Sequence, residues 1–153
     1  MNLWTRFWLA GAAVAVGALT APAAAQAATV TVNLSLTRYQ SVGQIDAGPV
    51  VGVSPARIVV RVGDSIVFVN QDSGGRHTAT GLTAARGRFP SDPRFTDAAL
   101  AATGTIGAGA WSTGELAPGA RSRPIAAEHP GTYLFGCFYD YSAGMRGEII
   151  VEP

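Results

Sequence analysis

The sequence predicts an all-β domain, an antiparallel sandwich or barrel, and two observations support this fold class. Short runs of residues alternate between apolar and polar side chains and are rich in β-branched types, a pattern typical of strands. Glycine and proline, 19 and 9 of the 153 residues, separate these runs from one another. The length is enough for one domain of this kind rather than two.

The predicted strands follow one another at short intervals along the chain. They cover residues 29–36, 56–62, 65–70, 77–82, 122–127, 132–137 and 145–151. Gly63 and Asp64 are a turn signal, which predicts a hairpin between the second and third strands. Pro130 and Gly131 predict the turn between the fifth and sixth strands.

Residues 83–110 depart from this rhythm. They are rich in Ala, Gly and Thr and contain Pro90 and Pro93. We expect one long loop here, with room for a short helix of one or two turns at residues 97–102. Long loops in small domains are often functional or partly ordered.

The first residues have the layout of a secretory signal peptide. Arg6 precedes an apolar run at residues 7–19, and small residues with an Ala-x-Ala exit follow. The alternative is a membrane anchor, but the run is shorter than the ~20 residues needed to span a bilayer. We therefore predict a signal peptide at residues 1–27, cleaved after Ala25 or Ala27, and a secreted or periplasmic domain at residues 28–153.

The charge of the mature domain is close to zero. All eleven basic residues are arginine, and loss of Arg6 leaves ten of them against ten acidic residues. This balance argues against a nucleic-acid or anionic membrane surface. We therefore expect no nucleic-acid partner and no membrane association after cleavage, and a monomer as the default state.

Cys137 is the only cysteine, so it cannot form an intramolecular disulfide. An unpaired thiol in an oxidising compartment is a liability unless it is buried, bound to metal or paired with another chain. Met145 follows eight residues later, and predicted strands lie on both sides of the pair. Such a loop can present a thiolate and a thioether to one soft metal ion, with His77 as a source of nitrogen. His129 would lie roughly 25 Å from Cys137 along an extended strand, so we expect it at the surface.

Two segments together resemble the cupredoxins, the blue copper proteins of the plastocyanin, amicyanin and pseudoazurin kind. The first is Val60-x-Val62-Gly63-Asp64-x-Ile-x-Phe68-x-Asn70-x-Asp72 followed by His77-Thr, and the second is Gly131-Thr-Tyr-x-Phe-x-Cys137, a short loop and Gly144-Met145-x-Gly147-x-Ile149-x-Val151. The resemblance covers about residues 55–153. It implies an antiparallel Greek-key β-sandwich with one type 1-like copper ion at one end. It also implies one-electron transfer with redox partner proteins.

Carried over position by position, the resemblance assigns His77 as the first nitrogen ligand, Cys137 as the thiolate and Met145 as the weak axial ligand. The second histidine ligand is expected three residues after the cysteine, where this chain has Asp140. Three interpretations remain open. The carboxylate binds copper, or it faces solvent and water or a partner completes the site, or the metal site is lost. Zinc also accepts His, Cys and Asp ligands, but the thioether favours copper.

The sequence thus predicts a copper-binding electron carrier whose reduction potential is lowered by a carboxylate ligand. The alternatives are a copper-holding protein for resistance or delivery, with copper-handling partners, and a metal-free interaction domain. We do not expect an enzyme, because the sequence shows no nucleophile–base pair, carboxylate pair or second metal centre. Tyr139 and Tyr141 flank Asp140 and are expected to cover the site as loop aromatics or to contact a partner.

Overall fold

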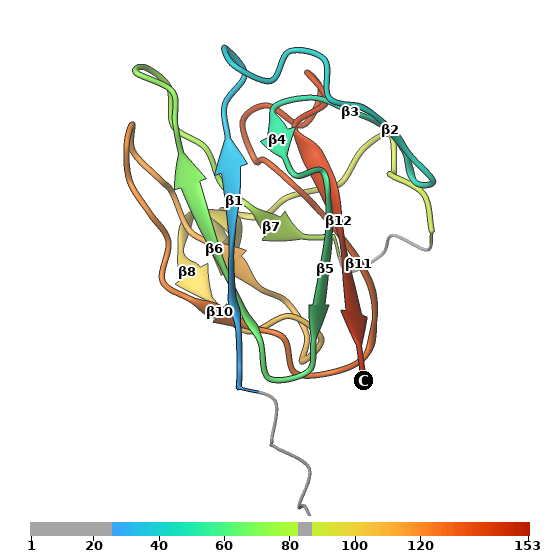
Figure 1. Ribbon diagram of the computed structural model, residues 1–153. Helices are drawn as coiled ribbons and strands as arrows, with labels where there is room; N and C mark the ends of the chain where they lie inside the picture. Colours follow the sequence, from blue (N-terminus) through green and yellow to red (C-terminus); the bar gives the residue numbers. More distant parts are fainter. Residues whose placement is uncertain (1–25, 83–86) are drawn as a thin grey trace, which may run out of the picture.

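The computed structural model describes residues 26–82 and 87–153, and it confirms the predicted β-sandwich (Figure 1). Most of the predicted signal peptide and part of the predicted long loop lie outside the described residues. One sheet has four strands in the order β10-β6-β1-β4, and the other has six in the order β5-β12-β11-β7-β9-β8. Within the described residues, no helix is both long and apolar enough to cross a membrane.

The elements are short, as the spacing of glycine and proline predicts. Their bounds are β1 (Thr29–Leu34), β2 (Gly43–Ile45), β3 (Gly48–Val50), β4 (Val53–Ser54), β5 (Arg57–Arg61), β6 (Ser65–Asn70), β7 (Thr80–Gly81), the 3₁₀ turn η1 (Asp97–Leu100), β8 (Ala102–Thr103), β9 (Ser112–Thr113), β10 (Ile125–Ala126), β11 (Gly131–Gly136) and β12 (Arg146–Glu152). The strands β2 and β3 form a small ladder of their own.

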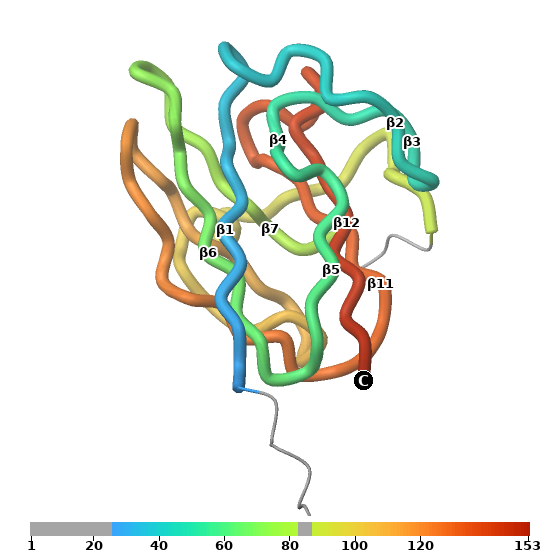
Figure 2. Tube along the Cα trace, in the orientation of Figure 1, coloured from blue at the N-terminus to red at the C-terminus, as the bar shows by residue number. Residues whose placement is uncertain are grey.

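The hairpin predicted at Gly63 and Asp64 is wrong, although both of its strands exist. The strand β5 pairs in parallel with β12, whereas β6 pairs in parallel with β1. The turn between β5 and β6 therefore carries the chain from one sheet to the other near the C-terminus (Figure 2), and Gly63 in this turn has φ of +94°. A local turn signal shows where the chain reverses but not which strand each arm pairs with. The sandwich is consequently mixed rather than wholly antiparallel.

Three aromatic rings fill the space between the sheets. Phe68 on β6 meets Phe135 on β11 edge to face at 5.3 Å between ring centroids, and Trp111 stacks on Phe68 at 6.0 Å. All three side chains are at most 3% exposed. The indole can lie this close only because position 81 is glycine, where a Cβ would overlap the Trp111 indole nitrogen.

Both faces of β11 are covered. Phe135 and Cys137 face the main core, as alternation along the strand predicts, while Leu134 on the other face is only 3% exposed. Part of the predicted long loop makes this second layer, because the Tyr141 hydroxyl donates to the Pro90 carbonyl at 2.6 Å. Phe89 and Phe95 of this loop pack on the same cluster, whereas the later part of the predicted loop contains η1 and β8, an edge strand of the sheet itself.

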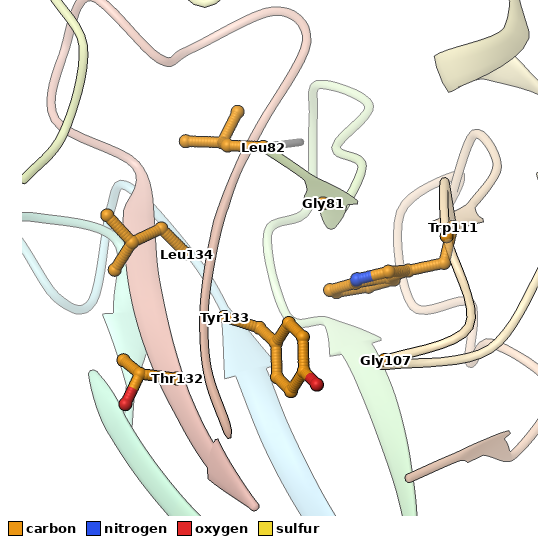
Figure 3. A pocket seen from close by; sticks show the side chains of 8 residues that line it. Gly81, Leu82, Gly107, Trp111, Thr132, Tyr133 and Leu134 are labelled. Carbon is orange, nitrogen blue, oxygen red and sulfur yellow. The ribbon is translucent and has the colours of Figure 1, made fainter. Parts of the chain in front are cut away.

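A hollow of about 370 Å³ lies on the same sheet, beside β7 and β11 (Figure 3). The Trp111 indole and the Tyr133 ring stand on its walls, and the Tyr133 hydroxyl donates to the backbone carbonyl of His129 at 3.1 Å. The described residues that line it include none of the predicted metal ligands.

Candidate metal centre

The loops that follow β1, β6 and β11 gather at the end of the sandwich away from the C-terminus (Figure 1). The loop after β6 ends at His77, whose backbone forms an isolated bridge with Leu116. Asn70, fully buried, holds this loop in shape: its amide donates to the carbonyls of Gly75 at 3.1 Å and Leu116 at 2.9 Å. Its side-chain oxygen also accepts from the Asp72 backbone N–H at 3.0 Å. The position of His77 is therefore fixed by the backbone on both sides.

The loop from Cys137 to Met145 closes on itself through backbone hydrogen bonds. The Cys137 N–H donates to the Met145 carbonyl at 2.9 Å, and the Met145 N–H donates to the Asp140 carbonyl at 3.1 Å. Cys137 is 1% exposed and Met145 is fully buried. These hydrogen bonds hold Cys137, Asp140 and Met145 in one rigid loop.

The structure brings His77, Cys137 and Asp140 together from both loops. The His77 Nδ1 atom lies 2.9 Å from Asp140 Oδ2 and 3.9 Å from Cys137 Sγ, and Sγ lies 3.5 Å from the same carboxylate oxygen. The three donor atoms are all within 4.8 Å of one another. Ligand bonds to zinc measure about 2.0–2.3 Å. Donor atoms on different sides of one such ion are therefore no more than about 4.6 Å apart, twice the longest of these bonds. An imidazole nitrogen, a thiol and a carboxylate fit a transition-metal ion in both spacing and chemistry.

Met145 is held at the end of the same loop, where the neighbouring segment before β4 packs against it. The Val51 N–H donates to the Gly144 carbonyl at 2.7 Å. Gly52 has φ of +77°, and a Cβ there would lie 2.8 Å from the Met145 methyl carbon. The bare backbone of Gly52 therefore leaves the room that the Met145 side chain occupies.

A second buried carboxylate, Asp72, lies on the other side of the His77 ring. Its Oδ2 atom is 2.8 Å from His77 Nε2, and the Asp72 side chain is only 4% exposed. The carboxylate also accepts from the Thr37 hydroxyl at 2.6 Å, from the Ser35 hydroxyl and from the Leu36 backbone N–H at 3.0 Å. Burial by itself raises the pKa of Asp72, but these hydrogen bonds hold it far below its ordinary value, so the group is ionised.

Sequence analysis assigned no role to Asp72. The signal available was an acidic residue two positions after Asn70 and five before His77, inside the segment that resembles the cupredoxins. Ser35 and Thr37, which hold the carboxylate, come from the end of the first strand and lie outside that segment. Only the folded structure brings these residues together.

The charge on His77 follows from this environment. Burial by itself lowers the His77 pKa, but hydrogen bonds with Cys137 and Asp72, the Cys137 charge and the bond with Asp140 raise it to about 9. At neutral pH the metal-free protein therefore carries an imidazolium between two carboxylates. In this cluster one positive charge is held between two negative side chains, and a metal ion can bind a histidine only after the ring has lost its proton at the ligand nitrogen.

The centre opens to solvent on the Asp140 side. A pocket of about 670 Å³ reaches His77 and Asp140, and the Asp140 side chain is 26% exposed. On its wall, the Tyr139 hydroxyl and the Arg76 guanidinium both donate to the Glu115 carboxylate. Tyr139 is 42% exposed at this mouth, so of the two tyrosines that flank Asp140 it is the one that a partner could touch.

Tyr141 lies in the loop between Cys137 and Met145, and its side chain is buried. It is 6% exposed and meets Phe95 edge to face at 5.8 Å between ring centroids. It therefore anchors this loop against Phe95 and Pro90 and does not cover the candidate metal centre. His129 is exposed, as the sequence predicts.

Comparison with known proteins defines the fold. No sequence-family model matches the chain, and no curated protein matches it. Among solved structures, reduced auracyanin from the photosynthetic bacterium Roseiflexus castenholzii aligns with a TM-score of 0.53 and 19% identity, over 82% of this chain and 97% of that one. Auracyanin B aligns with a TM-score of 0.52 and 19% identity, over 85% of this chain and 92% of that one. These neighbours are cupredoxins, and the chain is a β-sandwich with the cupredoxin fold.

Proposed function

We propose that this protein binds one copper ion in a type 1-like centre and transfers single electrons between partner proteins. The ligands are His77 Nδ1, Cys137 Sγ and an Asp140 carboxylate oxygen, with Met145 as a weak axial ligand. The observation that carries the proposal is the meeting of three donor atoms of different chemistry within 4.8 Å at one end of a cupredoxin fold. The domain acts in the periplasm or outside the cell, after removal of residues 1–27.

Bound copper would supply the one-electron change between Cu(I) and Cu(II). The protein contributes ligands that are already in position: His77 is fixed by Asn70 and Leu116, and Cys137 is tied to Met145. Because these side chains are buried in a rigid frame, the centre can change oxidation state with little rearrangement. The anionic oxygen of Asp140 favours Cu(II), so the reduction potential is lower than that of a His₂Cys centre.

The first test is the visible spectrum of residues 28–153 titrated with Cu(II). We expect a strong thiolate-to-copper band that saturates at one equivalent and is lost in Cys137→Ser. His129→Gln is the matched control, because this histidine is exposed and should not affect the band. A colourless protein that takes up no copper would refute the proposal and favour a metal-free interaction domain.

The role of Asp140 is tested by Asp140→His. We expect this variant to show a more ordinary blue-copper spectrum and a higher reduction potential, because a neutral imidazole replaces an anionic oxygen. An unchanged spectrum and potential would show that Asp140 is not a ligand and that the second interpretation, in which the carboxylate faces solvent, is correct.

The open pocket beside Asp140 favours a second candidate, a copper-holding protein for resistance or delivery. An accessible carboxylate ligand can be displaced by a partner's donor group, which allows ligand exchange and metal transfer. Voltammetry separates the two functions. Reversible cycling that persists at fast scan rates supports electron transfer, whereas irreversible waves with rapid loss of copper to a chelator support copper holding.

A further inference from the structure

We propose that Asp72 is a positioning residue that fixes the His77 ring for metal binding and makes the centre select divalent over monovalent ions. This inference rests on the proposed metal centre and deepens it, because it identifies the group that determines ion preference. Asp72 does not touch the metal in this proposal and acts through His77.

The geometry assigns a separate task to each nitrogen of the His77 ring. Nε2 lies 2.8 Å from the Asp72 carboxylate, while Nδ1 faces Asp140 at 2.9 Å and Cys137 at 3.9 Å. An ionised carboxylate can only accept hydrogen bonds, so Nε2 must carry a proton. When the ring is neutral, its free lone pair is then on Nδ1, on the side of the other two ligands.

The Asp72 carboxylate is itself held firmly. Its Oδ1 accepts from the hydroxyls of Ser35 and Thr37, and its Oδ2 accepts from the Leu36 backbone N–H. These three residues follow β1, whereas Asp72 follows β6, so the contact joins two neighbouring parallel strands. The carboxylate therefore cannot turn away from His77 without breaking several buried hydrogen bonds at once.

The charge of Asp72 provides the selectivity. An uncharged acceptor at this place would orient the ring equally well, but a buried carboxylate adds a full negative charge behind the ligand. With Asp140 and a Cys137 thiolate, three anionic groups surround one imidazole. A divalent ion balances more of this charge than a monovalent ion, and the low local dielectric strengthens the difference.

The decisive variant is Asp72→Asn, which keeps the size and an acceptor oxygen but removes the charge. We expect Cu(II) and Zn(II) to bind roughly 10–100-fold more weakly, the range typical of lost outer-shell partners, and Cu(I) to be affected less. Competition with chelators of known affinity measures each ion separately. The control is Asp64→Asn, because Asp64 also accepts two backbone hydrogen bonds but lies in the turn between β5 and β6.

Two outcomes would overturn the selectivity: an equal loss for Cu(I) and Cu(II), or no change in either. Thr37→Val offers an independent route if Asp72→Asn does not fold. It removes one hydroxyl donor from the carboxylate, and we expect the same direction of change with a smaller size. Unchanged affinities in a folded Thr37→Val would also contradict the proposal.

The orientation of the ring is tested by NMR of His77 in the metal-free and zinc-loaded protein. A protected Nε2–H signal in the wild type, and ¹⁵N shifts that place zinc on Nδ1, are the expected results. Zinc on Nε2 would overturn the role of Asp72 while leaving metal binding intact. A wild type that binds neither copper nor zinc would instead refute the proposed function, and the metal-free Nε2–H signal would still report on the contact with Asp72.

Discussion

The packing of Met145 against Gly52 can be tested by adding a single methyl group. In Gly52→Ala the new Cβ would lie 2.8 Å from the Met145 methyl carbon and 3.0 Å from Leu36 Cδ2, too close for either contact. The substitution also forces alanine into a left-handed backbone, since φ is +77°. Two separate penalties therefore act at one position.

Gly119 separates these two penalties. Its φ of +76° matches that of Gly52, but a Cβ there would meet nothing within 4 Å. We expect Gly119→Ala to lower the free energy of unfolding by about 1–2 kcal/mol, the backbone term alone. Gly52→Ala should lose this amount and a further ~1–3 kcal/mol for overpacking. The difference between the two variants measures the contact with Met145 and Leu36.

Urea unfolding of the metal-free protein gives both free energies, and the Cu(II) spectrum gives the functional result. Gly52→Ala should alter the energy of the thiolate band, because the thioether is displaced, whereas Gly119→Ala should leave the band unchanged. Equal losses of stability in the two variants would refute the reasoning. So would a displaced band in Gly119→Ala, because a Cβ at that position would meet no atom within 4 Å.

Three further predictions concern pH, packing and metal. The pKa of His77 is about 9 in the folded protein against an ordinary 6.5. Its proton therefore stabilises the metal-free fold fully below pH ~6.5 and progressively less as pH rises through ~9. Urea midpoints of the wild type should show this loss of stability, and those of His77→Gln should not. Gly81→Ala, which would press on the Trp111 indole, should lower the thermal midpoint and red-shift the tryptophan fluorescence, and an unchanged midpoint would contradict the packing described. Zinc at 1,000 times its Kd should raise the free energy of unfolding by about 4 kcal/mol, and much less in Cys137→Ser; equal stabilisation of both proteins would exclude the thiol as a ligand.

Local patterns predict strands well but do not predict their partners. Residues 57–61 alternate between exposed and buried side chains, and β5 lies where the alternation places it. The predicted hairpin failed because β5 and β6 each find a parallel partner far along the chain. Arg57 on β5 and Glu148 on β12, for example, form a hydrogen bond although they are 91 residues apart in the sequence. No turn signal encodes a contact of that range.

The candidate site divides in the same way. The spacing of Cys137, Asp140 and Met145 is local and can be read from the sequence, and the resemblance adds His77. The meeting of the first two with His77 is seen in the structure, and ligation by all four residues remains a prediction. The role of Asp72 could not be predicted from the sequence, because it depends on hydrogen bonds from Ser35 and Thr37. The pairing of β1 with β6 brings these two residues to Asp72.

The parallel pairing of β5 with β12 also bears on how the chain folds. When the chain is synthesised, its N-terminus emerges first, so β5 is an unpaired edge until β12, the last strand, has been made. Pairings between strands so far apart in the sequence form slowly. Cys137 and Met145 lie at the two ends of the loop that leads into that last strand. We therefore expect the candidate metal centre, which needs the loop between β11 and β12, to be among the final parts of the molecule to assemble.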